Sequence, residues 1–306
     1  MGKIAFMFSG QGAQHPSMGK DFYDSSKTVK QLFDQAELIR NGTLKQCFEG
    51  SEEELKQTEN TQPCLYLADI AAAIVLKEKG IEPDAVAGFS LGEIPSLAFA
   101  GFFSPIEGFK IACKRGEVMG EVSKNISASM AAVLKLDDST VEKLCEKYDN
   151  LFPVNYNSPG QVVVSGLMEE LEVFKDDVRT AGGRLLPLAV GGAFHSPFMN
   201  PAAEAFGNYL KNIQVQKTEM IAYSNYTAQP YDESVKELME KQINHPVKWA
   251  SIIQKMADTG FDTFIEVGVG TVLQKLVSRI LPSAKCYAVE SNEGVSKVLE
   301  EVMANK

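Results

Sequence analysis

Short apolar runs alternate with longer stretches of helical spacing along the first part of the chain. Apolar residues fill 4–8 after Lys3 and also the run that ends at Gly88, which predicts two buried strands at 3–8 and before Gly88. Between them, 29–40 and 63–79 have the apolar spacing of helices. This alternation is typical of an α/β protein that has helices on both faces of a mostly parallel sheet.

The pattern changes between Ser129 and Val190. Strands and helices are predicted there in the order βαββαβ, which is typical of a ferredoxin-like unit, at 129–136, 138–148, 151–156, 161–165, 167–181 and 184–190. We therefore expect a small subdomain over 129–191, inserted into a large α/β domain made of 1–128 and 192–306. A groove between the two is the expected place for a substrate.

Composition excludes several classes of protein. The apolar fraction of 44% is too high for a disordered chain, and the net charge of −10 over 306 residues disfavours a nucleic-acid surface. The sequence contains no run of about 18 uncharged apolar residues, so no membrane span is predicted. The N-terminus is expected to pass directly into a core strand rather than to form a signal peptide. Five cysteines without C-x-x-C spacing favour neither a disulfide framework nor a zinc site. We expect a cytoplasmic protein.

Residues 88–92 form a G-x-S-x-G motif between a predicted strand and a predicted helix. In this context the motif predicts a nucleophile elbow, in which a sharp turn presents Ser90 and two glycines let strand and helix approach closely. The alternative is a tight turn that happens to contain a serine. An oxyanion formed beside Ser90 would need N–H donors, and the candidates are the backbone of Leu91 and the glycine-rich loop 9–14.

Three histidines could activate this serine. His15 lies among polar residues, which favours a surface position, and His245 precedes a proline, so its side chain could point either way. His195 follows a glycine-rich, aromatic segment where the predicted subdomain returns the chain to the large domain. His195 is therefore either the base or a structural histidine.

Arg115 shares the apolar face of a predicted helix with residues three and four positions away. A guanidinium on such a face must be paired or must line a cavity. It therefore forms an internal salt bridge, lies with its charged end at the surface, or grips a substrate carboxylate with two parallel hydrogen bonds.

Together these stretches resemble the malonyl-CoA:acyl-carrier-protein transacylases of fatty acid synthesis and, more distantly, the acyltransferase domains of polyketide synthases. The matching motifs follow the family's order over nearly the whole chain, at 8–14, 61–63, 88–93, 115–116, 155–163, 194–196, 242–249 and 266–270. The resemblance implies a hydrolase-like large domain with a ferredoxin-like insert, which agrees with the order of elements predicted above.

The resemblance also implies roles for particular residues. Ser90 would be the nucleophile and His195 its base. The backbone N–H groups of Gln11 and Leu91 would hold the oxyanion. The main-chain carbonyl of Gln242 would accept a hydrogen bond from the imidazole, which gives a dyad without an essential aspartate.

Selectivity for the acyl group would depend on two further residues. Arg115 would bind the free carboxylate of malonyl, and Phe194 would leave no room for a branched acyl group. This chain departs from the family at Phe89, where histidine is usual, and at Val269, where proline is usual. We expect both changes to leave the chemistry intact.

We therefore expect an acyltransferase that moves malonyl from malonyl-CoA to the phosphopantetheine thiol of acyl carrier protein. It would act as a monomer without a metal or redox cofactor, and neither nucleic acid nor a membrane would be a partner. The alternatives are a trans-acting acyltransferase of a polyketide synthase, a serine thioesterase or other hydrolase with the same elbow, and a silent module that binds acyl carrier protein.

Overall fold

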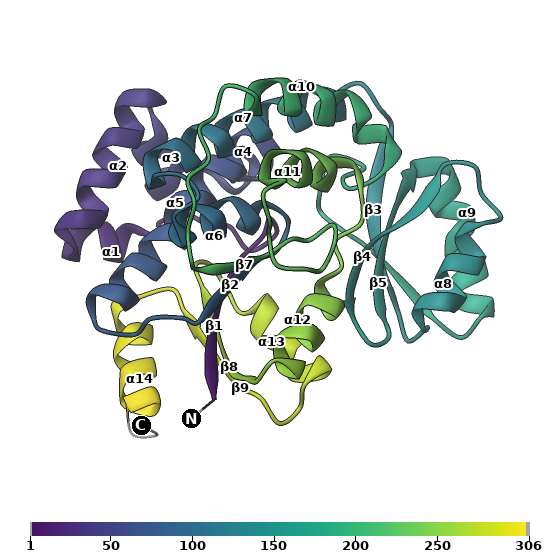
Figure 1. Ribbon diagram of the computed structural model, residues 1–306. Helices are drawn as coiled ribbons and strands as arrows, with labels where there is room; N and C mark the ends of the chain where they lie inside the picture. Colours follow the sequence, from purple (N-terminus) through teal and green to yellow (C-terminus); the bar gives the residue numbers. More distant parts are fainter. Residues whose placement is uncertain (1, 304–306) are drawn as a thin grey trace.

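Five parallel strands form the central sheet of the computed structural model, which describes residues 2–303 (Figure 1). Their order across the sheet is β7-β2-β1-β8-β9, and every neighbouring pair is parallel. Their bounds are β1 Lys3–Phe8, β2 Ala85–Gly88, β7 Ile221–Tyr223, β8 Phe261–Val267 and β9 Lys285–Val289. Both central strands, β1 and β8, are buried at nearly every position because helices cover both faces.

Alternate residues of β1 belong to two different cores. Phe6 and Phe8 pack into the larger core, whereas Ala5 and Met7 pack into a second core with α12 and α13. A strand sends successive side chains to opposite faces, so one apolar run supplies both cores. The helices around the sheet are α1 Lys20–Ser25, α2 Lys27–Ile39, α3 Thr43–Glu49, α4 Glu52–Lys56, α5 Thr58–Glu78, α6 Glu93–Ala100, α7 Pro105–Ser123, α10 Asn200–Leu210, α11 Val235–Asn244, α12 Trp249–Asp258, α13 Val272–Ile280 and α14 Asn292–Met303.

A second sheet of four antiparallel strands lies to one side of this body (Figure 1). Its order is β4-β5-β3-β6, and α8 and α9 pack on it around a separate small core. The elements are β3 Ala128–Leu134, α8 Asp138–Cys145, β4 Leu151–Ser158, β5 Gln161–Leu167, α9 Met168–Thr180 and β6 Arg184–Pro187. This is the βαββαβ order and ferredoxin-like strand arrangement expected from the sequence, so the predicted fold class is confirmed.

One strand is shorter than predicted. The apolar run 184–190 was expected to be a strand throughout, but β6 ends at Pro187. After the last backbone hydrogen bond to β3, from Leu188 N to Met130 O (2.9 Å), the chain leaves the sheet, and Leu188 and Val190 line a cavity instead. Their apolar side chains are explained by that cavity rather than by the sheet.

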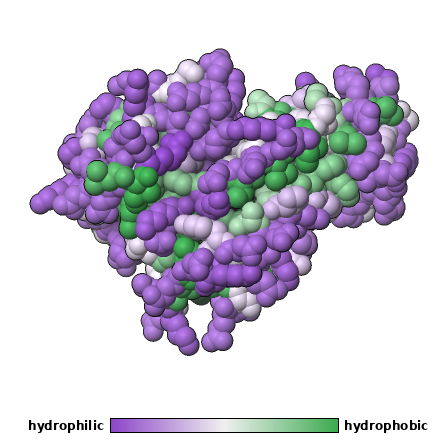
Figure 2. Space-filling view, turned by 90° about the horizontal axis from the view of Figure 1, so that it is seen from above, coloured by the Kyte–Doolittle hydropathy of each residue, from purple (hydrophilic) through white to green (hydrophobic). Residues whose placement is uncertain are grey.

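The second sheet joins the larger body where β4 approaches the segment before α12. Asn155 and Val247 form an isolated parallel bridge, with a hydrogen bond from Tyr156 N to Val247 O of 2.9 Å. Figure 2 shows the result from above as a larger body and a smaller lobe, with apolar residues gathered at the junction. The boundaries of the small subdomain, between residues 128 and 129 and between residues 191 and 192, remain predictions from the sequence. Within residues 2–303, no helix is both long and apolar enough to cross a membrane.

Candidate active site

Ser90 lies on a tight turn between β2 and α6. Its φ of 54° is in the left-handed region, and a 3-10 turn over Ser90–Gly92 leads directly into the helix. A Cβ atom on Gly88 would lie 1.9 Å from the carbonyl carbon of Gly92, and one on Gly92 would lie 2.2 Å from the carbonyl oxygen of Phe8. The two glycines of the motif are therefore required by the close approach of strand and helix, as expected for a nucleophile elbow.

His195 lies against this serine. Its Nε2 is 2.7 Å from Ser90 Oγ, and its Nδ1 is 2.8 Å from the main-chain oxygen of Gln242. A carbonyl can only accept, so Nδ1 carries the proton and Nε2 presents its lone pair to the serine hydroxyl. The ring is oriented by a carbonyl, with no carboxylate in that position.

The imidazole is held in its neutral form. Its exposed fraction is 3%, and burial lowers the pKa of His195 to about 3, with the nearby charge of Arg115 adding to the shift. A neutral imidazole with a free lone pair on Nε2 is the form needed to accept a proton at pH 7.

Arg115 reaches the same hydroxyl from α7. Its guanidinium donates to Gln62 Oε1 (2.9 Å), to Gln242 Oε1 (2.9 Å) and to Ser90 Oγ (3.2 Å). Only 2% of the residue is exposed, and no ion pair among residues 2–303 includes it, so the internal salt bridge considered above is not formed. Burial lowers the pKa of Arg115 to about 10, which leaves it a cation without a directly bonded anion.

A cavity of about 70 Å³ lies in front of these groups. All of the predicted site residues except Gln242 line it, and Gln242 instead contacts His195, Arg115 and Ser90 from behind. Residues without a predicted role also contribute to the wall. The full lining is Gln11, Gln62, Phe89, Ser90, Leu91, Arg115, Met119, Met130, Asn155, Leu188, Val190, Phe194 and His195.

Comparisons with known proteins agree with this geometry. The family described as acyl transferase domain matches residues 5–299. This chain belongs to that family. A curated relative from Bacillus subtilis (strain 168), named malonyl CoA-acyl carrier protein transacylase, is 37% identical over 308 aligned positions that cover 98% of this chain and 97% of that protein. The expected family and an acyltransferase activity are thereby confirmed.

Solved structures extend the similarity to the whole fold. The malonyl CoA-acyl carrier protein transacylase from Clostridium perfringens superimposes with a TM-score of 0.94 at 34% identity and covers 99% of this chain and 100% of that one. A malonyl-transacylase solved in complex with a type II polyketide synthase acyl-carrier protein gives a TM-score of 0.93 at 31% identity, covering 98% of this chain and 99% of that one.

The other two histidines of this acyltransferase lie elsewhere. His15 is exposed and forms an ion pair with Glu290. His245 packs on the ring of Tyr226 at 4.7 Å between centroids, and its Nδ1 bonds to Lys241 O (2.8 Å). Neither contacts Ser90, so His195 is the histidine whose position fits the expected role of base.

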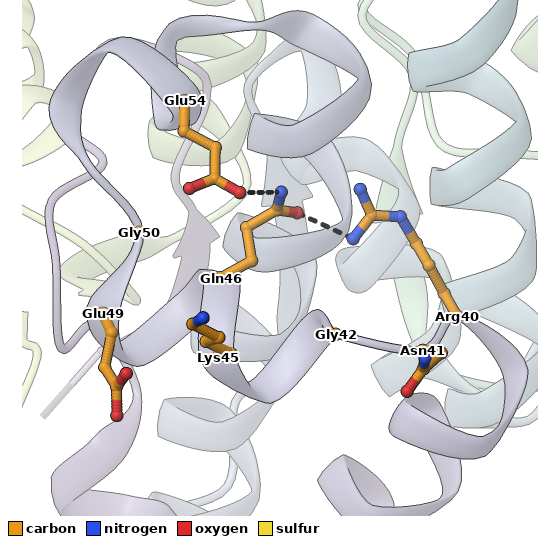
Figure 3. Close-up of a pocket in the computed structure, with 8 residues that line it drawn as sticks. All are labelled: Arg40, Asn41, Gly42, Lys45, Gln46, Glu49, Gly50 and Glu54. Carbon is orange, nitrogen blue, oxygen red and sulfur yellow. Dashed lines mark hydrogen bonds between the residues drawn. The ribbon is translucent and has the colours of Figure 1, made fainter.

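A larger pocket of about 420 Å³ lies between α2, α3 and α4 and contains none of the predicted site residues (Figure 3). Three of its polar side chains bond to one another: Arg40 donates to Gln46 Oε1 (2.7 Å), and Gln46 Nε2 donates to Glu54 (2.8 Å). Because this larger pocket contains none of the predicted site residues, the volume of a pocket does not by itself indicate the active site.

Sequence reasoning missed two residues at the site. Gln62 bonds to Arg115 and lies within the 61–63 motif, which was identified without a role for this side chain. Asn225, which contacts the backbone of Ser90, follows the short strand β7. No local pattern indicates Asn225, because its contact spans 135 positions of sequence.

Proposed function

We propose that this chain transfers the malonyl group from malonyl-CoA to the phosphopantetheine thiol of acyl carrier protein through a malonyl ester of Ser90. One observation carries the proposal: the Ser90 hydroxyl bonds at once to the neutral imidazole of His195 (2.7 Å) and to the buried guanidinium of Arg115 (3.2 Å). The first contact supplies a base, and the second places a cation where an acyl group with a free carboxylate would lie.

In the first half-reaction, Ser90 Oγ attacks the thioester carbonyl while its proton passes to His195 Nε2. The tetrahedral oxyanion accepts hydrogen bonds from the backbone N–H groups of Gln11 and Leu91. The carbon–sulfur bond then breaks, and the coenzyme A sulfur takes the proton from His195. Gln242 holds the imidazole in the required tautomer throughout.

In the second half-reaction, the carrier thiol gives its proton to His195 and attacks the malonyl ester. The carbon–oxygen bond to Ser90 breaks, and the serine recovers its proton from the imidazole. Arg115 holds the malonyl carboxylate in both halves through charge-assisted hydrogen bonds. Phe194, buried in the wall of the cavity, excludes a branched acyl group.

Neither half-reaction needs a metal or redox cofactor, and the only small-molecule substrates are coenzyme A thioesters. Acyl carrier protein is the macromolecular partner, and we propose a cytoplasmic enzyme that works as a monomer. A carrier of polyketide synthesis is a second candidate partner, because one of the similar structures is a malonyl-transacylase bound to such a carrier protein.

Intact-protein mass spectrometry after mixing with malonyl-CoA tests the proposal, with acetyl-CoA and Ser90→Ala in parallel. The expected result is a malonyl adduct that requires Ser90, persists without thiol and disappears on adding holo acyl carrier protein. Coenzyme A release without an adduct would instead indicate a hydrolase. Carrier binding with neither adduct nor release would indicate a silent binding module.

A further inference from the structure

A buried chain of hydrogen bonds runs from the backbone of the nucleophile elbow to Tyr231. Ser90 N donates to Asn225 Oδ1 (2.7 Å), and Asn225 N donates to Glu93 Oε1 (2.8 Å). The hydroxyl of Tyr231 donates to the same Glu93 oxygen (2.8 Å). Asn225 is fully buried and Glu93 is 2% exposed, so these contacts compete little with water.

Asn225 fixes both ends of the turn that presents the serine. Its Oδ1 accepts from Ser90 N, while its Nδ2 donates to the carbonyl oxygen of Gly88 (2.6 Å). Ser90 has a left-handed backbone, which a residue with a side chain keeps only when its surroundings impose it. The two hydrogen bonds of one amide are such a constraint.

Glu93 has no part in the transfer chemistry, yet it is a buried carboxyl group. Burial raises the pKa of Glu93 to about 7, and hydrogen bonds from Asn225 and Tyr231 and the charge of Arg115 oppose the shift. No ion pair among residues 2–303 includes it. Burying a carboxyl group costs free energy unless hydrogen bonds compensate for it. Here an oxygen of Glu93 accepts a hydrogen bond from Asn225 N and so fixes the backbone of Asn225.

We propose that Asn225, Glu93 and Tyr231 are positioning residues that hold the Ser90 elbow in the geometry for attack on the thioester. The inference rests on the proposed function, since its readout is the acylation of Ser90. Because none of the three side chains lines the cavity, they act on the rate of acylation rather than on the binding of malonyl-CoA.

Single-turnover acylation by malonyl-CoA, followed by quenched-flow mass spectrometry across donor concentrations, separates the maximal rate from the half-saturating concentration. For Asn225→Ala we expect a maximal rate about 100-fold lower, since small misplacement of a nucleophile has effects of this size. The half-saturating concentration should stay within about threefold, as expected for a group acting on the transition state alone.

Two substitutions at Glu93 separate its hydrogen bonds from its charge. Glu93→Gln keeps an oxygen that can accept from both Asn225 and Tyr231, so its acylation rate should stay within about threefold of the wild type. Glu93→Leu has no acceptor and should be about tenfold slower or more, because two buried donors lose their partner. If Gln and Leu lower the rate equally, the acceptor role is wrong.

Tyr231→Phe keeps the test open if the larger changes prevent folding. It removes one hydroxyl and should lower the maximal rate about threefold to tenfold. Tyr223→Phe is the matched control: it removes a hydroxyl at the end of β7 that is outside the network, and its maximal rate should stay at the wild-type value. Circular dichroism and melting temperature identify folded variants. Folded Tyr231→Phe and Asn225→Ala proteins that acylate at the wild-type rate would overturn the inference, while a wild-type protein that malonyl-CoA does not acylate would overturn the proposed function instead.

Discussion

Replacement of Arg115 by alanine tests how the cavity selects its acyl group. In the free protein the guanidinium bonds to two glutamine side chains and to Ser90 Oγ, and none of these partners is charged. A malonyl carboxylate would therefore meet a cation that is already desolvated and oriented. An acetyl donor has no carboxylate and gains nothing from this charge.

The size of the effect follows from the hydrogen bonds lost. A hydrogen bond to a charged group is worth about 1.5–3 kcal/mol, and each 1.36 kcal/mol is tenfold in rate. Arg115→Ala should thus lower the ratio of kcat/KM for malonyl over acetyl donors by about 10- to 150-fold. A ratio is the appropriate measure, because Arg115 also contacts Ser90 and affects His195, and those effects act on both donors.

The assay is competition between malonyl-CoA and acetyl-CoA for the same enzyme, with the two adducts resolved by mass. Arg115→Lys is the matched variant: it keeps a cation but cannot reproduce the planar fork, so its ratio should fall between those of wild type and alanine. Removal of the guanidinium leaves Gln62 and Gln242 oxygens without a donor, so melting temperature must be measured alongside. A folded Arg115→Ala protein with the wild-type ratio would refute the role.

Three further outcomes follow from the geometry of the site. Gly88→Ala should abolish folding or acylation, because its Cβ would lie 1.9 Å from backbone atoms of Gly92. Gly191→Ala is the control: its Cβ meets nothing within 4 Å, so its melting temperature and acylation rate should match those of the wild type. The folded-state pKa of His195 is about 3 against about 6.5 in the unfolded chain, so the unfolded state binds more protons between these values. Urea denaturation gives the free energy of unfolding of the wild type and of His195→Asn. The wild-type value minus the mutant value should be roughly 2 kcal/mol smaller at pH 5 than at pH 7. An equal difference at the two pH values would contradict a neutral, buried imidazole. Phe194→Ala should admit methylmalonyl-CoA as a donor in the adduct assay, and continued exclusion would show that another residue sets the size limit.

The sheet and the inserted unit were predictable because each depends on local patterns. The continuous apolar run at 4–8 indicates a strand buried on both faces, and the βαββαβ order between Ser129 and Val190 follows from short apolar runs that alternate with helical spacing. The apolar run 184–190 was misread beyond Pro187 for a physical reason: an apolar residue is equally suited to a strand and to the wall of a cavity. Periodicity does not distinguish those two environments.

The site was predictable only in part. Ser90 stands in a local motif, and the helical spacing placed Arg115 on an apolar face while leaving open an internal salt bridge, a charged end at the surface or a substrate site. The choice of His195 over the other histidines needed the family resemblance, since the residues alone left it open. Asn225 and Glu93 had no predicted role, because their contacts join positions more than 130 residues apart.

Gln242 explains how the proposed catalytic pair of Ser90 and His195 can work without an orienting carboxylate. Its main-chain carbonyl accepts from His195 Nδ1 (2.8 Å), its Oε1 accepts from Arg115 (2.9 Å), and its Nε2 donates to the main-chain oxygen of Ser90 (2.6 Å). One residue thus holds His195, Arg115 and Ser90, the proposed base, cation and nucleophile, relative to one another. A glutamate side chain at position 242 would form an ion pair with Arg115. It would then compete with the malonyl carboxylate for the guanidinium. The main-chain carbonyl and the neutral side-chain amide of Gln242 together contact the same three groups, and they would leave that positive charge for the malonyl carboxylate.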